Sequence, residues 1–390
     1  MANGWTGGQY SLVRVLTAAI VAVVVGSAIA AGGVVQILVG LMLLMLAAAF
    51  AVGWRGREVT VALTLGLLLL TLLLDYPRVW ESLAVLGPMV LVVMLAVHAR
   101  LAWAGPTPYG SLDARGRLDP GGEWQFPSWL FRRLWLAMGL VYVGGGVLLL
   151  RDEAWRLAEA LFYDDGQWAV LPWVGTMPEW LGRGLTWLLL GTWLAFGPLA
   201  LSRRNRRLAW SLTLGVNLLV LPLAGYWALA LALTAVHLLA FNPLWLPARP
   251  RSQPSTPPAT VYYDGHCGLC HRWVRFVLAE DVKGEQFVLS PLDSEHFREH
   301  VSAAQRETLP DSIIVRRGDG ELLVQSAAVL YILDRLGGLW RVAAMLGQAL
   351  PAPLCDAVYS QIAAVRRRLF AQPTDACPMM PPTLRARFRI

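Results

Sequence analysis

The sequence has little charge and few cysteines. Only 15% of its 390 residues are Asp, Glu, Lys or Arg, whereas 56% are hydrophobic. This balance excludes an intrinsically disordered chain and a wholly soluble globular protein. The chain has four cysteines, the first of them at residue 267, and so few thiols exclude a disulfide-dense secreted framework. The scarcity of charge therefore indicates a membrane protein. The cysteines, which all lie in the last third of the chain, indicate a separate chemical or metal site.

Charge and tryptophan divide the chain near residue 251. Residues 1–251 carry 18 Arg and 12 acidic residues, whereas residues 252–390 carry 15 basic and 14 acidic residues. Sixteen of the 18 Trp lie in the first part, as in the aromatic belts of membrane interfaces. The net charge of +7 therefore arises mostly in the apolar part, and we expect no nucleic acid among the partners.

Eight apolar runs in the first part approach the roughly 20 residues that a helix needs to cross a bilayer. The stretch from residue 208 to residue 244 is too long for one crossing, so the chain must turn back near Pro222 and Gly225. The sequence thus predicts a multi-pass α-helical membrane domain of about eight spans. The expected spans cover residues 13–31, 34–52, 59–74, 83–97, 134–150, 185–201, 208–223 and 227–244.

The arginines between the spans predict their orientation. Thirteen Arg follow the second, fourth, sixth and eighth spans, and four lie on the opposite side. Cytoplasmic loops collect positive charge, so we expect both termini in the cytoplasm and the chain in the inner (cytoplasmic) membrane of a bacterial-type cell. Ala28-Ile29-Ala30 is also similar to a signal-peptidase site, which leaves a cleaved signal peptide as an alternative interpretation of the first span.

Few polar side chains interrupt the spans. Asn217 and His237 are the main ones, and either a functional role or hydrogen bonds between helices would explain them. Residues 187–247 resemble the closing part of the horizontally transferred transmembrane domain, the membrane fold shared with vitamin K-dependent gamma-carboxylases. The resemblance implies the fold only, because that family's Glu near Ala195 and His near Asn217 are absent. The residues that carry it are Leu194-Ala195-Phe196-Gly197-Pro198-Leu199, the arginine turn at 203–207 and Phe241-Asn242-Pro243.

A proline-rich linker at residues 247–258 separates a membrane domain at 1–246 from a second domain at 259–390. Periodicity in the second domain predicts strands at 260–263, 287–289, 312–316 and 321–325. Helices are expected at 267–279, 294–300, 327–336, 340–350 and 354–370. The first seven of these elements follow the order βαβαββα, which predicts an α/β thioredoxin-like domain with a C-terminal helical extension.

Cys267 and Cys270 form a C-x-x-C pair at the junction of the first strand and its helix. Backbone N–H groups and the dipole at a helix N-terminus stabilise a thiolate, the nucleophilic form of cysteine. The spacing lets the second thiol attack a mixed disulfide formed by the first. We therefore expect Cys267 to be the catalytic nucleophile and Cys270 the resolving thiol. His266 and His271 flank the pair, either as modulators of its reactivity or as ordinary exposed histidines.

Metal binding is the alternative interpretation of this pair. C-x-x-C supplies half of a zinc site, but the sequence has no second C-x-x-C, so we expect no metal. His296 and His300 are interpreted as the solvated face of a polar helix, and Cys355 as a core residue. Cys377 lies in a proline-rich tail, either as a third redox thiol or as a surface residue.

The sequence around the pair resembles the DCC family of thioredoxin-like thiol-disulfide oxidoreductases. The motif is Val261-Tyr262-Tyr263-Asp264-Gly265-His266-Cys267-Gly268-Leu269-Cys270, and similar landmarks are Leu309-Pro310-Asp311-Ser312, Ser326-Ala327-Ala328-Val329, Leu336-Gly337-Gly338, Ala357-Val358-Tyr359 and Asp375-Ala376-Cys377-Pro378. The resemblance implies a redox pair at Cys267 and Cys270, with Asp264 as the family's aspartate. Asp264 then either shuttles a proton or, with Gly265, shapes the turn. Pro310 occupies the place where thioredoxin-like folds keep a cis-proline facing the cysteines.

These observations predict a membrane-anchored thiol-disulfide oxidoreductase with a cytoplasmic C-x-x-C pair and no cofactor. Its expected partners are the lipid bilayer and a protein or small-molecule thiol or disulfide. The sequence also allows two alternatives: a module that passes zinc or copper to the membrane half, and an electron donor for quinone-linked chemistry within the spans.

Overall fold

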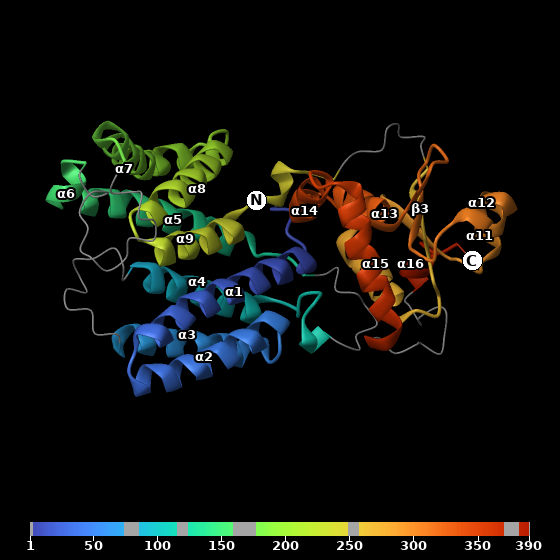
Figure 1. The fold of residues 1–390 in the computed structure, drawn as a ribbon, viewed down its shortest axis with the longest axis horizontal. Coiled ribbons are helices and arrows are strands. Elements are labelled where there is room, and N and C mark those ends of the chain that lie inside the picture. Colours follow the sequence, from blue (N-terminus) through green and yellow to red (C-terminus); the bar gives the residue numbers. More distant parts are fainter. Residues whose placement is uncertain are drawn as a thin grey trace. The chain divides into compact units, whose positions relative to one another are not determined.

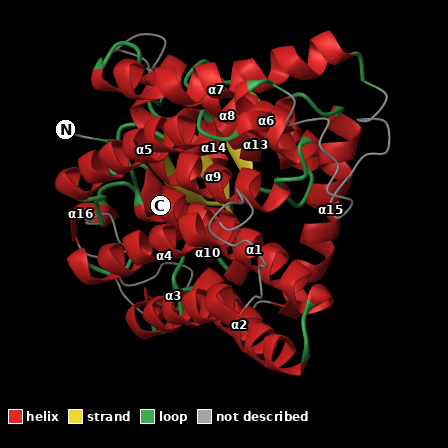
Figure 2. Cartoon of the chain, turned by 90° about the vertical axis from the view of Figure 1, so that its left-hand side faces the viewer, coloured by secondary structure: helices red, strands yellow, loops and turns green. Residues whose placement is uncertain are grey.

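The computed structural model describes residues 3–73, 86–114, 124–158, 177–248, 257–369 and 382–389. The chain forms two compact units. The first contains residues 11–105 and 126–241 and is helical throughout its described residues (Figures 1 and 2). The second contains residues 3–10, 106–125 and 242–390 and holds the four-stranded sheet. Two segments that the sequence places in the membrane domain therefore belong to the unit that carries the sheet.

Helices occupy all eight positions where spans are expected. Six of them, α1 to α5 and α7, are long and apolar enough to cross a membrane, which supports a membrane protein. In the described part of the chain α8 does not meet that standard, and α9 is a shorter apolar helix. The helices are α1 (Gly7–Ala31), α2 (Val34–Val52), α3 (Gly56–Leu73), α4 (Leu86–Ala104), α5 (Ser128–Leu149), the short α6 (Glu153–Arg156), α7 (Glu179–Leu201), α8 (Arg206–Leu223) and α9 (Trp227–Ala240).

The helices of the first unit pack as neighbours in two groups that meet at α9. Helix α3 packs between α2 and α4, and α7 packs between α5 and α8. Helix α9 contacts α4, α5 and α8. Buried Leu, Phe and Trp side chains such as Leu63, Trp193 and Phe196 fill the contacts, while many Leu and Val side chains face outward. An apolar outer surface is what a lipid environment requires, because lipid cannot drive these side chains inward.

The second unit is built on the mixed sheet β2-β1-β3-β4. Its strands are β1 (Ala259–Tyr263), β2 (Phe287–Pro291), β3 (Ile314–Arg316) and β4 (Leu322–Val324). Strand β1 pairs in parallel with β2 and antiparallel with β3, and β3 pairs antiparallel with β4. All five residues of β1 are buried, as expected for a central strand with both faces covered. The element order matches the predicted thioredoxin-like arrangement.

Helices α10 (Gly268–Glu280), α13 (Gln325–Leu336), α14 (Gly338–Gln348) and α15 (Ala352–Leu369) agree with the predicted helices to within two residues. Helix α11 (Glu295–His300) is also as expected, whereas α12 (Ala303–Thr308) and α16 (Pro382–Arg385) are additions. Serine caps explain α11 and α12: Ser294 accepts from Phe297 N–H, and Ser302 forms a capping box with Gln305. One core joins α10, α13 and the sheet through side chains such as Val277, Ile332 and Phe287.

The last residues of the chain extend the sheet beside β2. Leu289 N–H donates to the Arg387 carbonyl at 2.9 Å, and Arg389 N–H donates to the Leu289 carbonyl at 2.8 Å. Between them Phe388 enters the core, with 7% of its surface exposed. Most of the predicted linker, residues 249–256, lies outside the described residues, as does the tail that carries Cys377.

Candidate active site

The two cysteines lie at the start of α10, immediately after β1. Cys267 has the extended backbone of an N-cap residue, and its Sγ accepts a hydrogen bond from Cys270 N–H at 3.4 Å. Cys267 therefore takes the position that Ser or Asp usually fills, where the unpaired N–H groups of the first turn are available. The sulfur of Cys267 thus lies where backbone N–H groups at the helix N-terminus can reach it.

A tight turn between β1 and α10 presents the pair. The Oδ1 atom of Asp264 accepts from His266 N–H at 2.9 Å, and the Asp264 carbonyl accepts from Cys267 N–H. Gly265 is buried in this turn, and its carbonyl accepts from Nε2 of His271 at 2.7 Å. These bonds fit the turn-forming role of Asp264 that the sequence suggested. His266 is exposed, and His271 bonds back to the loop that carries the thiols.

The two thiols differ in accessibility. Cys267 is 6% exposed, whereas Cys270 is half-buried and contacts the core. The described cysteines, Cys267, Cys270 and Cys355, are all thiols and none forms a disulfide bond. Burial limits the access of a large molecule to the Cys267 sulfur. The capping position is the feature that sets Cys267 apart from Cys270.

The loop before β3 contains Pro310, which is exposed. The described residues contain no cis peptide bond, so the bond before Pro310 is trans. Helix α15 holds this loop in place, because the Tyr359 hydroxyl accepts from Ile313 N–H at 2.9 Å. The same helix contributes Asp356, whose carboxylate accepts from the N–H and the hydroxyl of Ser326 at the start of α13. The segments around Ser326 and Tyr359, which the sequence marked as similar to the family, thus both take part in holding α15 against the domain.

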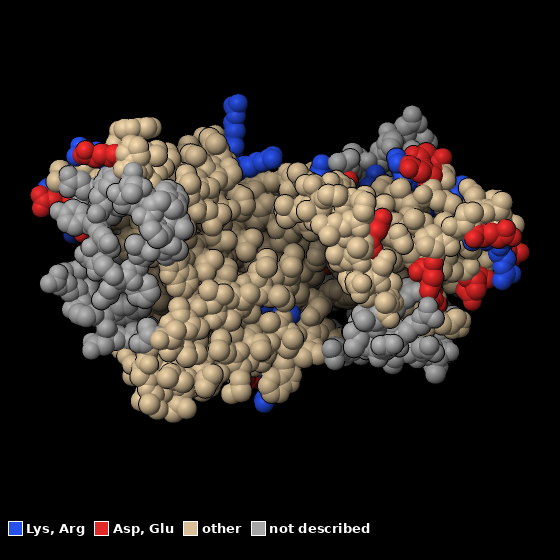
Figure 3. All heavy atoms as spheres, in the orientation of Figure 1, with Lys and Arg blue, Asp and Glu red and all other residues tan. Residues whose placement is uncertain are grey.

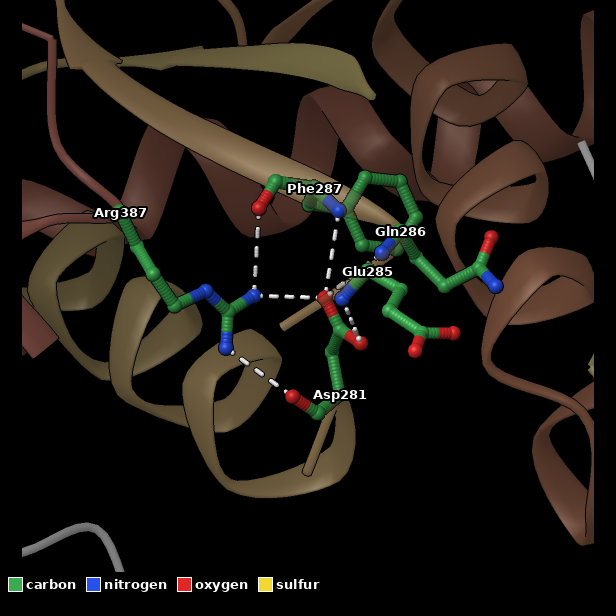
Figure 4. A network of polar contacts seen from close by, with 5 residues as sticks. All are labelled: Asp281, Glu285, Gln286, Phe287 and Arg387. Carbon is green, nitrogen blue, oxygen red and sulfur yellow. Dashed lines mark hydrogen bonds and ion pairs between the residues drawn. The ribbon is translucent and has the colours of Figure 1, made fainter. Parts of the chain in front are cut away.

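The far end of α10 is fixed by a buried ion pair (Figure 4). The Asp281 carboxylate accepts from the N–H groups of Glu285, Gln286 and Phe287 at 3.1–3.2 Å and from Arg387 Nη2 at 2.6 Å. Arg387 also donates to the main-chain carbonyls of Asp281 and Phe287. Burial lowers the pKa of Arg387, and the adjacent carboxylate opposes that shift. The sequence carried no signal for this pair, because 106 residues separate its members.

A second buried carboxylate, Glu280, binds the start of the chain. It accepts from the Thr6 hydroxyl, from Gly8 N–H at 2.9 Å and from Trp340 Nε1 at 2.5 Å. Burial raises the pKa of Glu280, and the three donors oppose that shift. A Cβ atom at Gly8 would lie 2.5 Å from Glu280 Oε1, so a larger residue there would have to displace this carboxylate. The N-terminal segment is thus part of the unit that carries the cysteines.

Metal ligands do not gather in the described part of the chain: no group there combines three or more His, Cys, Asp or Glu residues. His296 and His300 stack at 4.1 Å, but one hydrogen-bonds Tyr262 and the other the main chain. Cys355 is half-buried, and its thiol donates to the Gly347 carbonyl.

In the first unit, Asn217 and His237 are buried between helices. Asn217 donates to the Tyr142 hydroxyl at 2.9 Å and accepts from Trp193 Nε1 at 2.8 Å. Nδ1 of His237 lies 2.9 Å from the Leu233 carbonyl and 3.3 Å from the Tyr142 hydroxyl. These contacts join α5, α7, α8 and α9 and fit the structural interpretation of both side chains.

Comparison with known proteins identifies the second unit. The family model described as DCC1-like thiol-disulfide oxidoreductase matches residues 261–372. The uncharacterized protein YuxK of Bacillus subtilis (strain 168) is 31% identical over 136 residues, which cover 34% of this chain and 94% of YuxK. No solved structure matches the chain significantly. With its C-x-x-C pair at the start of α10, the chain belongs to the DCC1-like thiol-disulfide oxidoreductase family and is an oxidoreductase enzyme.

Proposed function

We propose that the protein is anchored in the inner membrane and exchanges thiols and disulfides at its cytoplasmic face through Cys267 and Cys270. The Cys267 thiolate attacks a substrate disulfide, forms a mixed disulfide and releases one substrate thiolate, which takes up a proton. The Cys270 thiolate then attacks Cys267 Sγ and releases the second substrate thiol. The substrate gains two electrons, and the enzyme is left with a Cys267–Cys270 disulfide.

The observation that carries this proposal is the capping position of Cys267. Its sulfur accepts the N–H of the other cysteine in the pair, so the attacking and resolving thiols belong to one helical turn. Asp264 and Gly265 are proposed to shape the turn, Pro310 to border it, and His266 and His271 to tune the thiols. A cytosol poised at roughly −220 to −320 mV favours reduction or isomerisation of the substrate over its oxidation.

The composition of the second unit supports an even number of crossings. Residues 3–10, 106–125 and the sheet all belong to it. Glu280 binds Thr6 and Gly8, and the Tyr109 hydroxyl donates to the Arg272 carbonyl at 3.1 Å. A single compact unit lies on one side of a bilayer. The chain must therefore cross the bilayer an even number of times between residues 10 and 106, and again between residues 125 and 242. Helices α1 to α4 before residues 106–125, and α5 and α7 to α9 after them, meet that condition.

Trapping of a mixed disulfide tests the proposal. Cells that carry Cys270→Ser are quenched with acid and an alkylating agent, and adducts of Cys267 are identified by mass spectrometry. We expect a discrete partner that disappears in the Cys267→Ser/Cys270→Ser variant. Metal handling would replace thiol exchange as the proposed function if two results are found together. The folded Cys270→Ser protein would trap no partner, and the wild type would bind a metal that this substitution removes. A fluorescent reporter fused to the C-terminus tests the cytoplasmic location of the domain. We expect fluorescence, and a folded fusion protein without fluorescence would contradict that location.

A further inference from the structure

Helices α14 and α15 expose an apolar stripe that no element of the described chain covers. Leu354, Val358 and Ile362 recur every four residues along α15, and each is more than half exposed. Residues four apart lie on one face of a helix. Met345, Leu346 and Leu350 continue the stripe from the end of α14, with Leu346 67% exposed. We call these six residues the α14–α15 stripe.

The opposite face of α15 explains why the stripe points outward. Asp356 and Tyr359 face the domain, where they bond Ser326 and Ile313. These bonds fix the rotation of the helix about its axis, so the stripe cannot turn inward without breaking them. An exposed apolar helix face of this kind is typical of an interaction site.

The sequence around the stripe is rich in arginine. Residues 335–369 contain five Arg and one acidic residue, Asp356, whose carboxylate accepts from the Ser326 hydroxyl. One of the five, Arg341, forms an ion pair with Asp334 at 3.5 Å. Three of these arginines, Arg366, Arg367 and Arg368, directly follow the stripe in the sequence. Residues 257–334 contain twelve acidic and seven basic residues. In the view of Figure 3, acidic side chains are spread over the part of this unit that carries β3, α11 and α12, with basic side chains among them.

The start of α14 is bonded to two segments that adjoin predicted spans. Gly338 N–H donates to the Leu246 carbonyl at 2.6 Å, and Leu339 N–H donates to Gln9 Oε1 at 3.1 Å. Leu246 follows α9 by six residues, and Gln9 lies in the first turn of α1. A Cβ atom at Gly338 would lie 2.3 Å from the Gln9 side chain, which shows how closely the segments approach.

We propose that the α14–α15 stripe lies on an anionic lipid surface, the cytoplasmic leaflet of the membrane that holds the chain. Apolar side chains enter the boundary between headgroups and acyl chains, and the arginines that follow them bind anionic headgroups. A membrane accounts for both the exposed apolar residues and the arginines, because an anionic leaflet combines an apolar interior with a negatively charged surface. The proposal rests on the membrane anchoring in the proposed function and not on the thiol chemistry.

Photocross-linking in the full chain tests this contact. A diazirine amino acid is placed at Val358 or Ile362, and the protein is reconstituted in nanodiscs of phosphatidylcholine with phosphatidylglycerol or of phosphatidylcholine alone. Ala304, an exposed apolar residue of α12 in the acidic part of the domain, is the matched control position. We expect about tenfold more lipid adduct at Val358 and Ile362 than at Ala304 in the anionic nanodiscs. The adducts are expected to fall about tenfold in phosphatidylcholine alone, or when Arg366→Gln, Arg367→Gln and Arg368→Gln are combined.

Three results would overturn the proposal. Adducts that join two copies of the chain would assign the stripe to a second copy. Lipid adducts no more frequent than at Ala304 would show that the stripe does not contact the membrane. Equal numbers of adducts in the two lipid compositions would show that anionic lipid is not required. Disulfide trapping at Cys267 is measured in the same samples, so loss of lipid contact with trapping intact refutes only this proposal.

Discussion

Replacement of Arg387 by alanine tests whether the C-terminal segment stabilises the catalytic domain. Arg387→Ala removes the 2.6 Å bond to Asp281 and two bonds to main-chain carbonyls. It leaves a carboxylate that is only 5% exposed without its counter-charge. Removal of one partner of a buried ion pair costs about 3–5 kcal/mol. Three N–H groups still bond Asp281, so we expect a loss near the lower limit, about 3 kcal/mol.

Hydrogen exchange of the full chain measures this loss locally. A free-energy change of about 3 kcal/mol corresponds to a roughly 150-fold fall in the protection of amides that open with β2. Arg389→Ala is the matched control, because among the described residues its exposed guanidinium donates to the main-chain carbonyls of Ala386 and Phe388 and to no carboxylate. Its cost should stay within about 0.5 kcal/mol, or roughly a twofold change in protection.

A loss of β2 protection in Arg387→Ala no larger than in Arg389→Ala would refute this expectation. The pair would then contribute no net stability, because the desolvation of both groups would cancel their attraction. Adding Asp281→Asn to Arg387→Ala gives a second check. A neutral amide needs no counter-charge, so the double variant should regain part of the lost protection; a further loss would show that the charge of Asp281 is not the source of the penalty.

The remaining predictions concern the contacts that hold the domain together. Burial raises the pKa of Glu280, so the stability that its proton adds is complete below the ordinary Glu pKa of roughly 4.3 and is lost as the pH rises through the raised pKa. In thermal unfolding, the stability advantage of wild type over Glu280→Gln should therefore shrink as the pH rises. An advantage that does not change with pH would contradict this. Gly8→Ala forces a Cβ against Glu280 and should cost about 1–3 kcal/mol, seen as proteolysis near the N-terminus, whereas Gly26→Ala, with open space around its Cβ, should change nothing. Tyr359→Phe leaves the Ile313 N–H without its acceptor and should lower the free energy of unfolding by about 1–3 kcal/mol, and an unchanged melting curve would argue against that bond.

Local patterns in the sequence were sufficient to predict the order of the elements. Apolar runs placed eight helices, and the alternation after residue 258 placed the strands and helices of the thioredoxin-like sheet. The C-x-x-C pair fell at a helix N-terminus because Gly268 and the apolar periodicity of Val274 and Val277 begin the helix there. Short serine-capped helices such as α12 were missed, since six residues are too few to show a period.

By itself, the sequence determined the membrane class, the family and the cysteine pair, because hydrophobic periodicity and a short motif are properties of neighbouring residues. Only the tertiary structure decided which distant segments complete the catalytic domain. Glu280 binds Thr6 and Gly8 across more than 270 residues, and Asp281 binds Arg387 across 106. Buried charge must find a partner wherever the fold brings one near, and no local pattern records which residue that will be.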